Sequence, residues 1–325
     1  KISVIAKETY SIEVYKKGFF STEAQKYLGK IKTIKIGIPD FVKEKNNENI
    51  YLLEEEDYKN IIPKRDIVGH KGDYGKVLIL AGSKGFTGAA YIVAESTART
   101  GSGLVTLLIE DELQNIFSTR LIEQMTLRYS ETEKIEKLLK NIDVLICGSG
   151  LSQNNENVNM LQKCIKESNC YVVADADALN IISRKEELLK SLKGRAIFTP
   201  HPGEMARLVK KSISDVENNR IEISREYAKE NGVIVLLKGY NTVITNGEKT
   251  IINTTGTSKM ASGGMGDCLS GIIGSLVGQS KNLFNSAILG AYIHGKSGDK
   301  LGKTRFSVNS RDIIEAIPSI MEDLN

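Results

Sequence analysis

The sequence predicts a three-layer α/β/α sandwich with a mainly parallel central sheet covered by helices on both faces. From Lys76 onward, short β-branched apolar runs alternate with amphipathic stretches of helix length, which is the pattern of βαβ units. Glycine, polar and charged residues follow directly after these runs, where the ligand crevice of such a sheet lies. The length of 325 residues allows one large α/β domain with a smaller appendage.

The first 45 residues are predicted to form a small separate unit. Two stretches of alternating apolar residues, Ser11 to Tyr15 and Ile31 to Ile38, indicate strands. A pair of strands is not stable by itself, so we expect them to belong to a sheet whose other members are not evident in this unit. The polar run at 43–49 predicts a linker over 46–60, and residues 61–325 then form the main domain.

The main domain is predicted to contain eight strands and at least three long helices. The expected parallel strands are 76–81, 104–109, 143–147, 171–175, 195–199 and 233–237. The runs 242–245 and 249–253 are separated by a turn containing Asn246-Gly247, which predicts an antiparallel hairpin at the edge of the sheet. Helices are expected near 264–278, 283–300 and 309–320.

Composition and charge argue against several classes of protein. The chain has 44 Lys plus Arg and 40 Asp plus Glu, a net charge of +4. No basic stripe is interleaved with aromatic residues, so we expect no nucleic-acid binding. No apolar segment approaches ~18 residues, and the first ten residues lack the order of a secretory signal, so we expect a cytoplasmic protein with no membrane span. The four cysteines lack metal-pair spacing, which argues against a zinc site or a disulfide framework.

A glycine-rich loop before a helix is the strongest single sign of chemistry. Residues 253–267 end in Gly263-Gly264-Met265-Gly266-Asp267 and lead into the apolar stretch 268–277. Such a turn presents backbone N–H groups and the positive end of a helix dipole, which bind phosphate oxygens. Asp267 then lies where a carboxylate can take a proton from a substrate hydroxyl during phosphoryl transfer. The simpler alternative is that Asp267 caps the helix and the glycines only permit close packing.

Six sequence blocks together resemble the NAD(P)H-hydrate dehydratases, a branch of the ribokinase-like superfamily. The resemblance runs in order from about Ile61 to the C-terminus, and the joint match is far more specific than any single block. The blocks are His70-Lys71-Gly72-Asp73-Tyr74-Gly75, Gly82 to Ala90, Gly101-Ser102-Gly103-Leu104-Val105, Asp175-Ala176-Asp177-Ala178-Leu179-Asn180, Thr199-Pro200-His201-Pro202-Gly203-Glu204 and Gly263 to Asp267.

The resemblance implies a repair enzyme of ribokinase-like fold that converts hydrated NADH or NADPH (NADHX, NADPHX) back to the working cofactor. ADP or ATP is the implied co-substrate, with Mg2+ required, and the products are AMP or ADP plus phosphate. The nucleotide first phosphorylates a hydroxyl on the hydrated nicotinamide ring, and elimination of phosphate then restores the ring. Two alternatives stay open: a ribokinase-like kinase of a small molecule, because that superfamily shares the anion loop, and a non-catalytic nucleotide sensor.

The resemblance also implies roles for individual residues. Asp267 is the implied catalytic base and also contacts the substrate. The implied phosphate and nucleotide contacts are Lys238, Gly239, Tyr240, Asn241, Thr242, Gly264 and Gly266. The other implied substrate contacts are Ala90, Gly150 and His201, and no metal ligand is assigned.

Some of these residues have a second, purely structural interpretation. Lys238 suits a diphosphate as a point charge, or is a solvated surface lysine. His201, held in a rigid turn between two prolines, points into the crevice or is a structural histidine. Asp177 positions substrate or Mg2+ indirectly, or caps a helix. His70 and Lys71 precede the first strand and are candidates to cover the site.

Residues 9–39 resemble the tail of the NAD(P)HX epimerase domain that precedes the dehydratase in bifunctional bacterial members of the family. Most of that domain, including its catalytic and potassium-binding residues, would lie upstream of Lys1. We therefore expect no epimerase activity from this chain alone, and a complementing epimerase half is a candidate partner. The family also implies a homo-oligomer, expected to be a tetramer.

Overall fold

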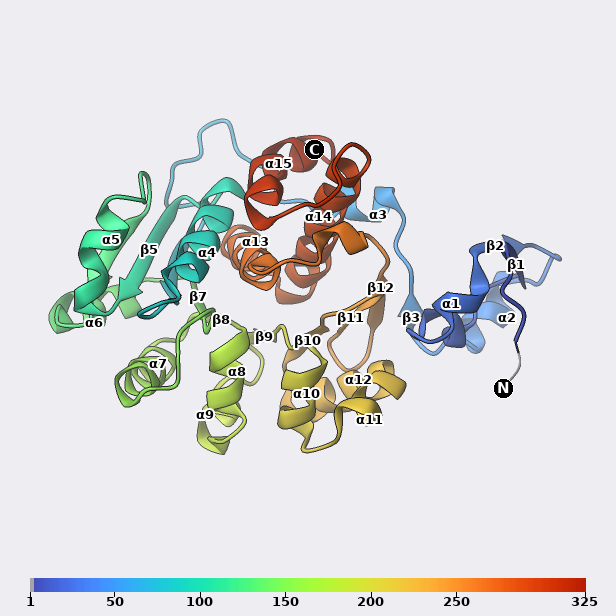
Figure 1. Cartoon of the computed structure of the whole chain (residues 1–325), viewed down its shortest axis with the longest axis horizontal. Helices are drawn as coiled ribbons and strands as arrows, with labels where there is room; N and C mark the ends of the chain where they lie inside the picture. The colour runs from blue at the N-terminus through green and yellow to red at the C-terminus, as the bar shows by residue number, and fades with distance from the viewer. Residues whose placement is uncertain (1–2) are drawn as a thin grey trace.

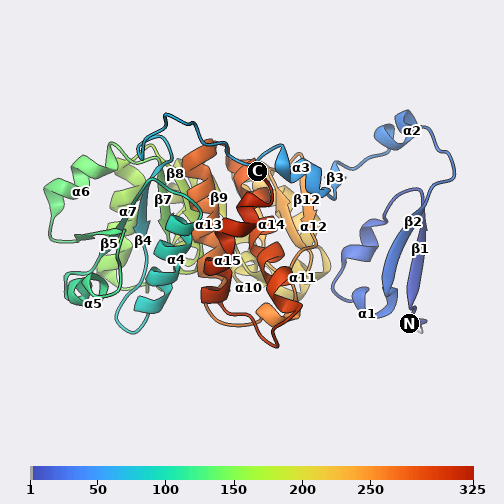
Figure 2. The same ribbon diagram turned by 90° about the horizontal axis from the view of Figure 1, so that it is seen from above.

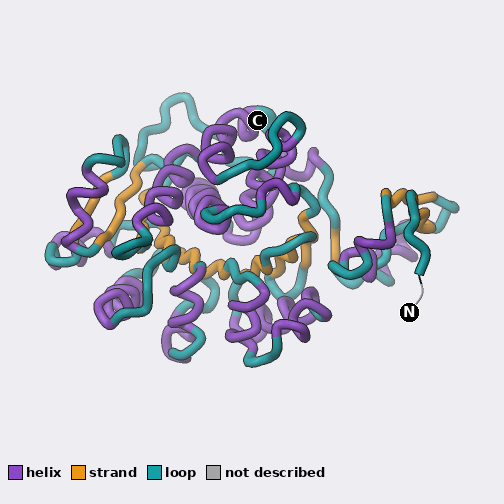
Figure 3. Tube along the Cα trace, viewed as in Figure 1, coloured by secondary structure: helices purple, strands orange, loops and turns teal. Residues whose placement is uncertain are grey.

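The computed structural model describes residues 3–325; residues 1 and 2 of the predicted N-terminal unit lie outside the described part. Ten strands form one sheet, with helices above and below it (Figures 1 and 3). The strands are β3 (Ile50–Tyr51), β4 (Lys76–Leu80), β5 (Leu104–Ile109), β6 (Met125–Arg128), β7 (Val144–Cys147), β8 (Tyr171–Ala174), β9 (Ala196–Phe198), β10 (Ile234–Leu237), β11 (Thr242–Thr245) and β12 (Thr250–Asn253). The predicted three-layer α/β/α architecture is confirmed.

The sheet is parallel apart from one strand. Its order is β3-β12-β11-β10-β9-β8-β7-β4-β5-β6, and within the described residues only β11 runs against its two neighbours. The eight predicted strands each agree with the structure to within one residue at either end. The hairpin β11–β12 lies one strand in from the edge, because β3 pairs in parallel with β12.

Alternate side chains of each strand pack into two separate cores, one on each face of the sheet. Ile79, Leu107 and Ile146 face one helical layer, and Leu78 and Leu145 face the other. The first layer contains α3 (Glu55–Lys59), α4 (Thr87–Arg99), α13 (Met265–Ser280), α14 (Leu283–Gly302) and α15 (Ser310–Glu322). The second contains α6 (Thr132–Leu139), α7 (Asn155–Glu167), α8 (Ala176–Ile182), α9 (Glu186–Ser191), α10 (Pro202–Val209), α11 (Ile213–Asn218) and α12 (Arg220–Asn231). Strands buried on both faces explain why the sequence shows continuous apolar runs there.

Short elements and buried thiols complete this description. Near β6 lie the 3-10 helix η2 (Asp111–Leu113) and α5 (Gln114–Ser118), and η3 (Ser258–Met260) precedes α13. All four cysteines are buried thiols, with Cys147 and Cys164 in one core and Cys268 in the other. None of the helices within residues 3–325 is both long and apolar enough to span a membrane.

The N-terminal unit forms its own two-stranded sheet, set to one side of the main sheet (Figure 2). It contains β1 (Glu8–Ile12), η1 (Lys17–Phe20), α1 (Gln25–Leu28), β2 (Lys30–Ile34) and α2 (Asp40–Lys45), and β1 pairs with β2 in parallel. The strand predicted at 11–15 lies three residues earlier, because Glu13 has a φ of 64°, which ends the extended run. Val4, Ile5, Ile36 and Phe41 remain exposed.

The segment predicted as a linker, 46–60, contains β3 and α3. Tyr58 of α3 is buried, and its ring stacks on Tyr292 of α14 with centroids 3.7 Å apart. These contacts attach residues 50–59 to the large sheet and its helices. The predicted division of the chain into an N-terminal unit (1–45), a linker (46–60) and a main domain (61–325) stays a prediction.

Candidate active site

The loops after five strands meet at the carboxyl ends of the sheet, as expected for a parallel α/β fold. The loop after β4 joins the loop after β7, because Gly82 N donates to Ser149 O at 2.8 Å and Ser83 Oγ donates to Gly150 O at 2.9 Å. The end of β10 joins the loop after β9, because Lys238 N donates to the carbonyl of Pro200 at 2.8 Å. The first turn of α13 completes this crevice.

A cluster of one ammonium and three carboxylates occupies the crevice. Lys238 Nζ donates to Asp175 Oδ1 at 2.6 Å and lies 3.9 Å from Glu204 Oε2. The Asp175 and Glu204 side chains are buried, and the Lys238 side chain is only 21% exposed. Burial acts to lower the pKa of Lys238, but the two carboxylates outweigh it and raise that pKa. Lys238 is therefore an ion-paired residue of the crevice, which rules out its interpretation as a solvated surface lysine.

Asp267 is the third carboxylate of this cluster. Burial raises the pKa of its carboxyl group, and the nearby Asp175 adds to that effect, while Ser149 and Lys238 oppose it. Ser149 Oγ is buried, and no described residue meets the geometry of a hydrogen bond with it. It nevertheless lies close enough to the Asp267 carboxyl group to lower the pKa of that carboxyl group. A carboxyl group with a raised pKa is a stronger base once ionised, which suits general-base chemistry.

The glycine-rich loop leaves the start of α13 uncapped. Gly264 is the N-cap residue with φ of 88°, and no side chain within residues 3–325 caps the helix. Asp267 is the third residue of the helix, so the alternative in which it serves as the cap does not hold. A Cβ atom at Gly266 would lie 3.3 Å from Lys238 Nζ and 3.4 Å from Asp175 Oδ2, so the loop lies directly against the charged cluster. Uncapped N–H groups beside a lysine can bind phosphate oxygens.

Among the predicted nucleotide-binding residues, 238–241 form the loop of the β10–β11 hairpin and Thr242 begins β11. Thr242 Oγ1 donates to Gly239 O at 3.0 Å, which closes the loop on itself. Tyr240 is 61% exposed, whereas Asn241 is buried and its amide donates to Phe20 O of the N-terminal unit at 3.4 Å. The structure therefore brings Lys238, Gly264, Gly266 and Asp267 together, with Thr242 closing the loop beside them.

The three other predicted substrate contacts lie around this crevice in different settings. Gly150 is fixed by Ser83 at the mouth of the loop after β7. Ala90 is fully buried, and a Cβ atom at Gly82 would lie 2.7 Å from its methyl group, so Ala90 shapes the loop after β4. His201 caps α10: its Nδ1 accepts from Gly203 N at 2.9 Å, and its Nε2 lies 3.3 Å from Glu204 Oε1. The contacts of these residues with substrate stay predictions.

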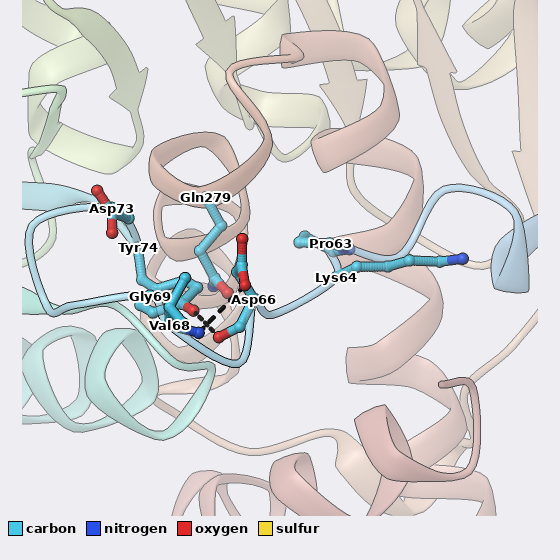
Figure 4. A pocket seen from close by; sticks show the side chains of 8 residues that line it. All are labelled: Pro63, Lys64, Asp66, Val68, Gly69, Asp73, Tyr74 and Gln279. Carbon is cyan, nitrogen blue, oxygen red and sulfur yellow. Dashed lines mark hydrogen bonds between the residues drawn. The ribbon is translucent and has the colours of Figure 1, made fainter.

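His70 and Lys71, candidates to cover the site, lie at the opposite end of the sheet in this chain. Their loop precedes β4 and borders a cavity of about 270 Å³ that Gln279, near the end of α13, also lines. Asp267 and Gln279 are twelve residues apart along α13, roughly 18 Å. Figure 4 shows Asp66 and Gln279 close together there, with the Lys64 side chain pointing away from them. Chain order already indicated this, because a residue that precedes a parallel strand lies at the end of the sheet opposite the crevice.

Asp177 holds a loop of the protein. Its two carboxylate oxygens accept from Ser152 N and Gln153 Nε2, each at 2.9 Å. Asp175 is instead the residue of that block which enters the cluster, and together with Glu204 it was assigned no role from the sequence. Only their positions could have indicated a role: Asp175 directly follows β8, and Glu204 lies soon after β9, at the crevice end of the sheet.

The described side chains of the crevice offer no dedicated metal cage. Among the side chains that the structure describes, no three form a ready metal-binding group. Asp175 and Glu204 nevertheless present two carboxylates to one ammonium. Mg2+ commonly binds proteins through one or two carboxylates, substrate phosphates and water. Because Lys238 already engages both carboxylates, a Mg2+ ion here would be carried mainly by nucleotide phosphates and water, with Asp175 and Glu204 as the nearest protein carboxylates.

Comparison with known proteins identifies the family. The sequence profile described as NAD(P)H-hydrate dehydratase matches residues 77–319. The chain is 34% identical over 309 residues to the bifunctional NAD(P)H-hydrate repair enzyme Nnr of Moorella thermoacetica, covering 91% of this chain and 58% of that protein. It is also 34% identical over 267 residues to the ADP-dependent (S)-NAD(P)H-hydrate dehydratase of Staphylococcus aureus, covering 81% of this chain and 94% of that protein.

A solved structure has the same fold. The ADP/ATP-dependent NAD(P)H-hydrate dehydratase of Bacillus subtilis, co-crystallized with ATP/Mg2+, aligns with a TM-score of 0.74 at 24% identity, covering 86% of this chain and all of that one. The chain spans 58% of the length of the Moorella repair enzyme and nearly the full length of the Staphylococcus dehydratase. With a matching profile over most of its length and the charged cluster at the expected crevice, this chain belongs to the NAD(P)H-hydrate dehydratase family.

Proposed function

We propose that this chain catalyses the nucleotide-dependent dehydration of NADHX and NADPHX to NADH and NADPH. The observation that carries the proposal is the placement of Asp267 on the uncapped first turn of α13, beside Lys238. Anion-binding N–H groups, a cation and a general base are thereby combined at one point of the crevice. Phosphoryl transfer to a hydroxyl group needs these three components.

In the first step, Asp267 accepts the proton of the hydroxyl on the hydrated nicotinamide ring. The hydroxyl oxygen forms a bond to the terminal phosphorus of the nucleotide, and the bond from that phosphorus to the bridging oxygen breaks. ADP thereby becomes AMP, or ATP becomes ADP. In the second step the carbon–oxygen bond breaks and phosphate leaves with that electron pair, while the neighbouring ring carbon gives up a proton to solvent and the electrons of its C–H bond form the ring double bond. A hydroxide leaving group has been replaced by phosphate, which leaves far more readily.

Lys238 and the α13 turn stabilise negative charge on the transferring phosphoryl group. The predicted nucleotide contacts Gly239, Tyr240, Asn241 and Thr242 would hold the nucleotide along the β10–β11 loop. Mg2+, when bound, would neutralise phosphate charge, with Asp175 and Glu204 as the carboxylates closest to Lys238. Ala90, Gly150 and His201 would then border the hydrated dinucleotide.

The proposal is tested by mixing purified protein with NADHX, Mg2+ and either ADP or ATP. The near-ultraviolet absorbance of the dihydronicotinamide should return only when nucleotide is present, and the faster nucleotide identifies the donor. The relative from Staphylococcus aureus is named ADP-dependent, so we propose ADP as the preferred donor. A folded protein that binds nucleotide but leaves the absorbance flat would contradict the proposal and favour a kinase of another hydroxyl substrate.

We further propose that the protein acts in the cytoplasm as a homo-oligomer, with an epimerase half as its partner. A bifunctional repair enzyme that aligns over 98% of this chain, and therefore over most of the N-terminal unit, is longer than this chain. The unpaired edges of β1 and β2 and the exposed Ile36 and Phe41 suit completion by further strands of such a half. Light scattering of the chain alone, and after mixing with an epimerase domain, would measure both associations. A monomer that binds no epimerase domain would contradict them.

A further inference from the structure

A buried arginine lies behind the predicted nucleotide-binding loop. Arg220 is the first residue of α12 and is 6% exposed. Its Nη2 donates to the carbonyl oxygens of Leu237 and Lys238, each at 3.0 Å. Its Nη1 donates to Glu217 Oε2 at 3.3 Å. Arg220 thus contacts the backbone of the last residue of β10 and of the residue that follows it.

The guanidinium group also lies against the next residue of the loop. Gly239 has a φ of 146°, and a Cβ atom there would lie 2.9 Å from Arg220 Nη2 and 3.0 Å from Nη1. No side chain fits in this space, so glycine is required at 239 for as long as the arginine stays in place. The loop and the guanidinium group therefore fix each other.

Arg220 supplies hydrogen bonds at the point where the strand ladder stops. The β10–β11 register ends at the pair Leu237 and Val243, so the Lys238 carbonyl has no partner in that ladder. Three groups from different elements then hold Lys238: the Pro200 carbonyl at its backbone N–H, Arg220 at its carbonyl, and Asp175 at its ammonium. Fixing the backbone at both ends limits where the Lys238 ammonium can lie.

We propose that Arg220 is a positioning residue for nucleotide binding, acting through Lys238 and Gly239. This inference rests on the proposed nucleotide contacts of residues 238–242. Arg220 holds the loop in its ligand-binding shape before nucleotide arrives, so the free energy of ordering the loop is not subtracted from the binding free energy. Removal of the guanidinium group is expected to weaken nucleotide affinity much more than it lowers turnover at saturating nucleotide.

The test compares Arg220→Met, Arg220→Lys and the control Arg225→Met, which removes an arginine of the same helix that forms none of these hydrogen bonds. Nucleotide dissociation constants come from calorimetry, and KM and kcat from the absorbance assay. We expect Arg220→Met to raise the nucleotide Kd and KM roughly 10- to 100-fold, with kcat changed much less. Arg220→Lys should recover part of the affinity, and Arg225→Met should bind nucleotide like the wild type.

Chemical rescue provides a second readout that a general structural defect would not give. A cavity of about 290 Å³ lies beside the arginine, lined by residues that include Lys17, Phe20, Glu217, Arg220 and Asn241. Guanidinium ion at concentrations well below those that unfold proteins should restore nucleotide affinity to Arg220→Ala, and sodium chloride at the same ionic strength should not.

The outcomes separate this inference from the proposed function. If Lys238→Ala weakens nucleotide binding but folded Arg220→Met binds as tightly as the wild type, the positioning role is refuted. The same holds if Arg220→Lys and guanidinium both fail to recover any affinity, because the arginine then acts only through overall stability. If the wild type binds no nucleotide at all, the proposed function itself fails.

Discussion

Replacement of Asp267 by asparagine should abolish most turnover and at the same time stabilise the fold. In the cluster, Lys238 balances only one of three carboxylates, and burial already disfavours the charged form of Asp267. At an effective dielectric constant of ~20, two unit charges ~8 Å apart repel by ~2 kcal/mol. Solvent at a half-buried carboxylate reduces this to about 1 kcal/mol, which the neutral amide would relieve.

The sign of the pH dependence follows from the raised pKa of Asp267. A carboxyl group with a raised pKa in the folded state binds its proton more tightly there than in the unfolded chain. Its contribution to the free energy of unfolding is therefore fully present at low pH and is lost as pH rises through the folded pKa. The stabilisation by Asp267→Asn should appear at pH 7, as a Tm increase of ~2 °C, and shrink as pH is lowered toward ~4.

The assay combines three measurements on the same preparations. Turnover of NADHX should fall roughly 10²–10⁴-fold in Asp267→Asn, as expected for loss of a general base. Nucleotide Kd should stay within a few-fold of the wild type. Asp323→Asn is the control, because Asp323 pairs with Lys300 at an exposed surface and should change neither quantity. Unchanged turnover would remove Asp267 from the base role, and a Tm lowered by several degrees would refute the charge-imbalance argument.

Three further substitutions test other parts of the structure. Lys238→Ala should raise the nucleotide KM at least ~10-fold; an unaltered KM would show that the nucleotide binds elsewhere. Ser149→Ala removes a group that lowers the pKa of Asp267, so the acidic limb of the kcat/KM profile should move to higher pH, and Ser149→Thr should move it less; a limb that stays in place would exclude Ser149 from that role. Tyr58→Ala, which removes the buried stack on Tyr292, should cost about 3 kcal/mol and lower the Tm by ~6 °C or more. The exposed Phe41→Ala is its control, and an equal Tm for the two variants would mean that α3 adds nothing to the fold.

Much of the fold could be predicted because its strands are buried on both faces. Strands β4, β5 and β7 are continuous apolar runs that the sequence shows directly. Strand β6 was missed because it is a short edge strand, Met125–Arg128, in which only Leu127 is buried. Strand β3 has two residues, and its pairing with β12 depends on a partner some 200 residues away. Edge strands carry too little apolar pattern to be recognised before the sheet is known.

The site was predictable where a local motif carries the chemistry, and was missed where the partners are distant in sequence. Gly264, Gly266 and Asp267 follow one another, so the anion loop could be recognised directly. The pairing of Lys238 with Asp175 joins residues 63 positions apart, and no local pattern connects them. Arg220 was overlooked for another reason: an arginine in a charged helix normally points to solvent, and only the packing of α12 under β10 buries it.

Labelling of the four buried thiols would report when the helical layers separate from the sheet. Burial raises the pKa of Cys164 to about 12 and also raises that of Cys147, so neither is present as the reactive thiolate at neutral pH. A soluble alkylating reagent can then label them only when the layer that covers them separates from the sheet. Cys268 lies in the core on one face and Cys147 and Cys164 in the core on the other, so the labelling rates of individual cysteines would time the exposure of each helical layer separately.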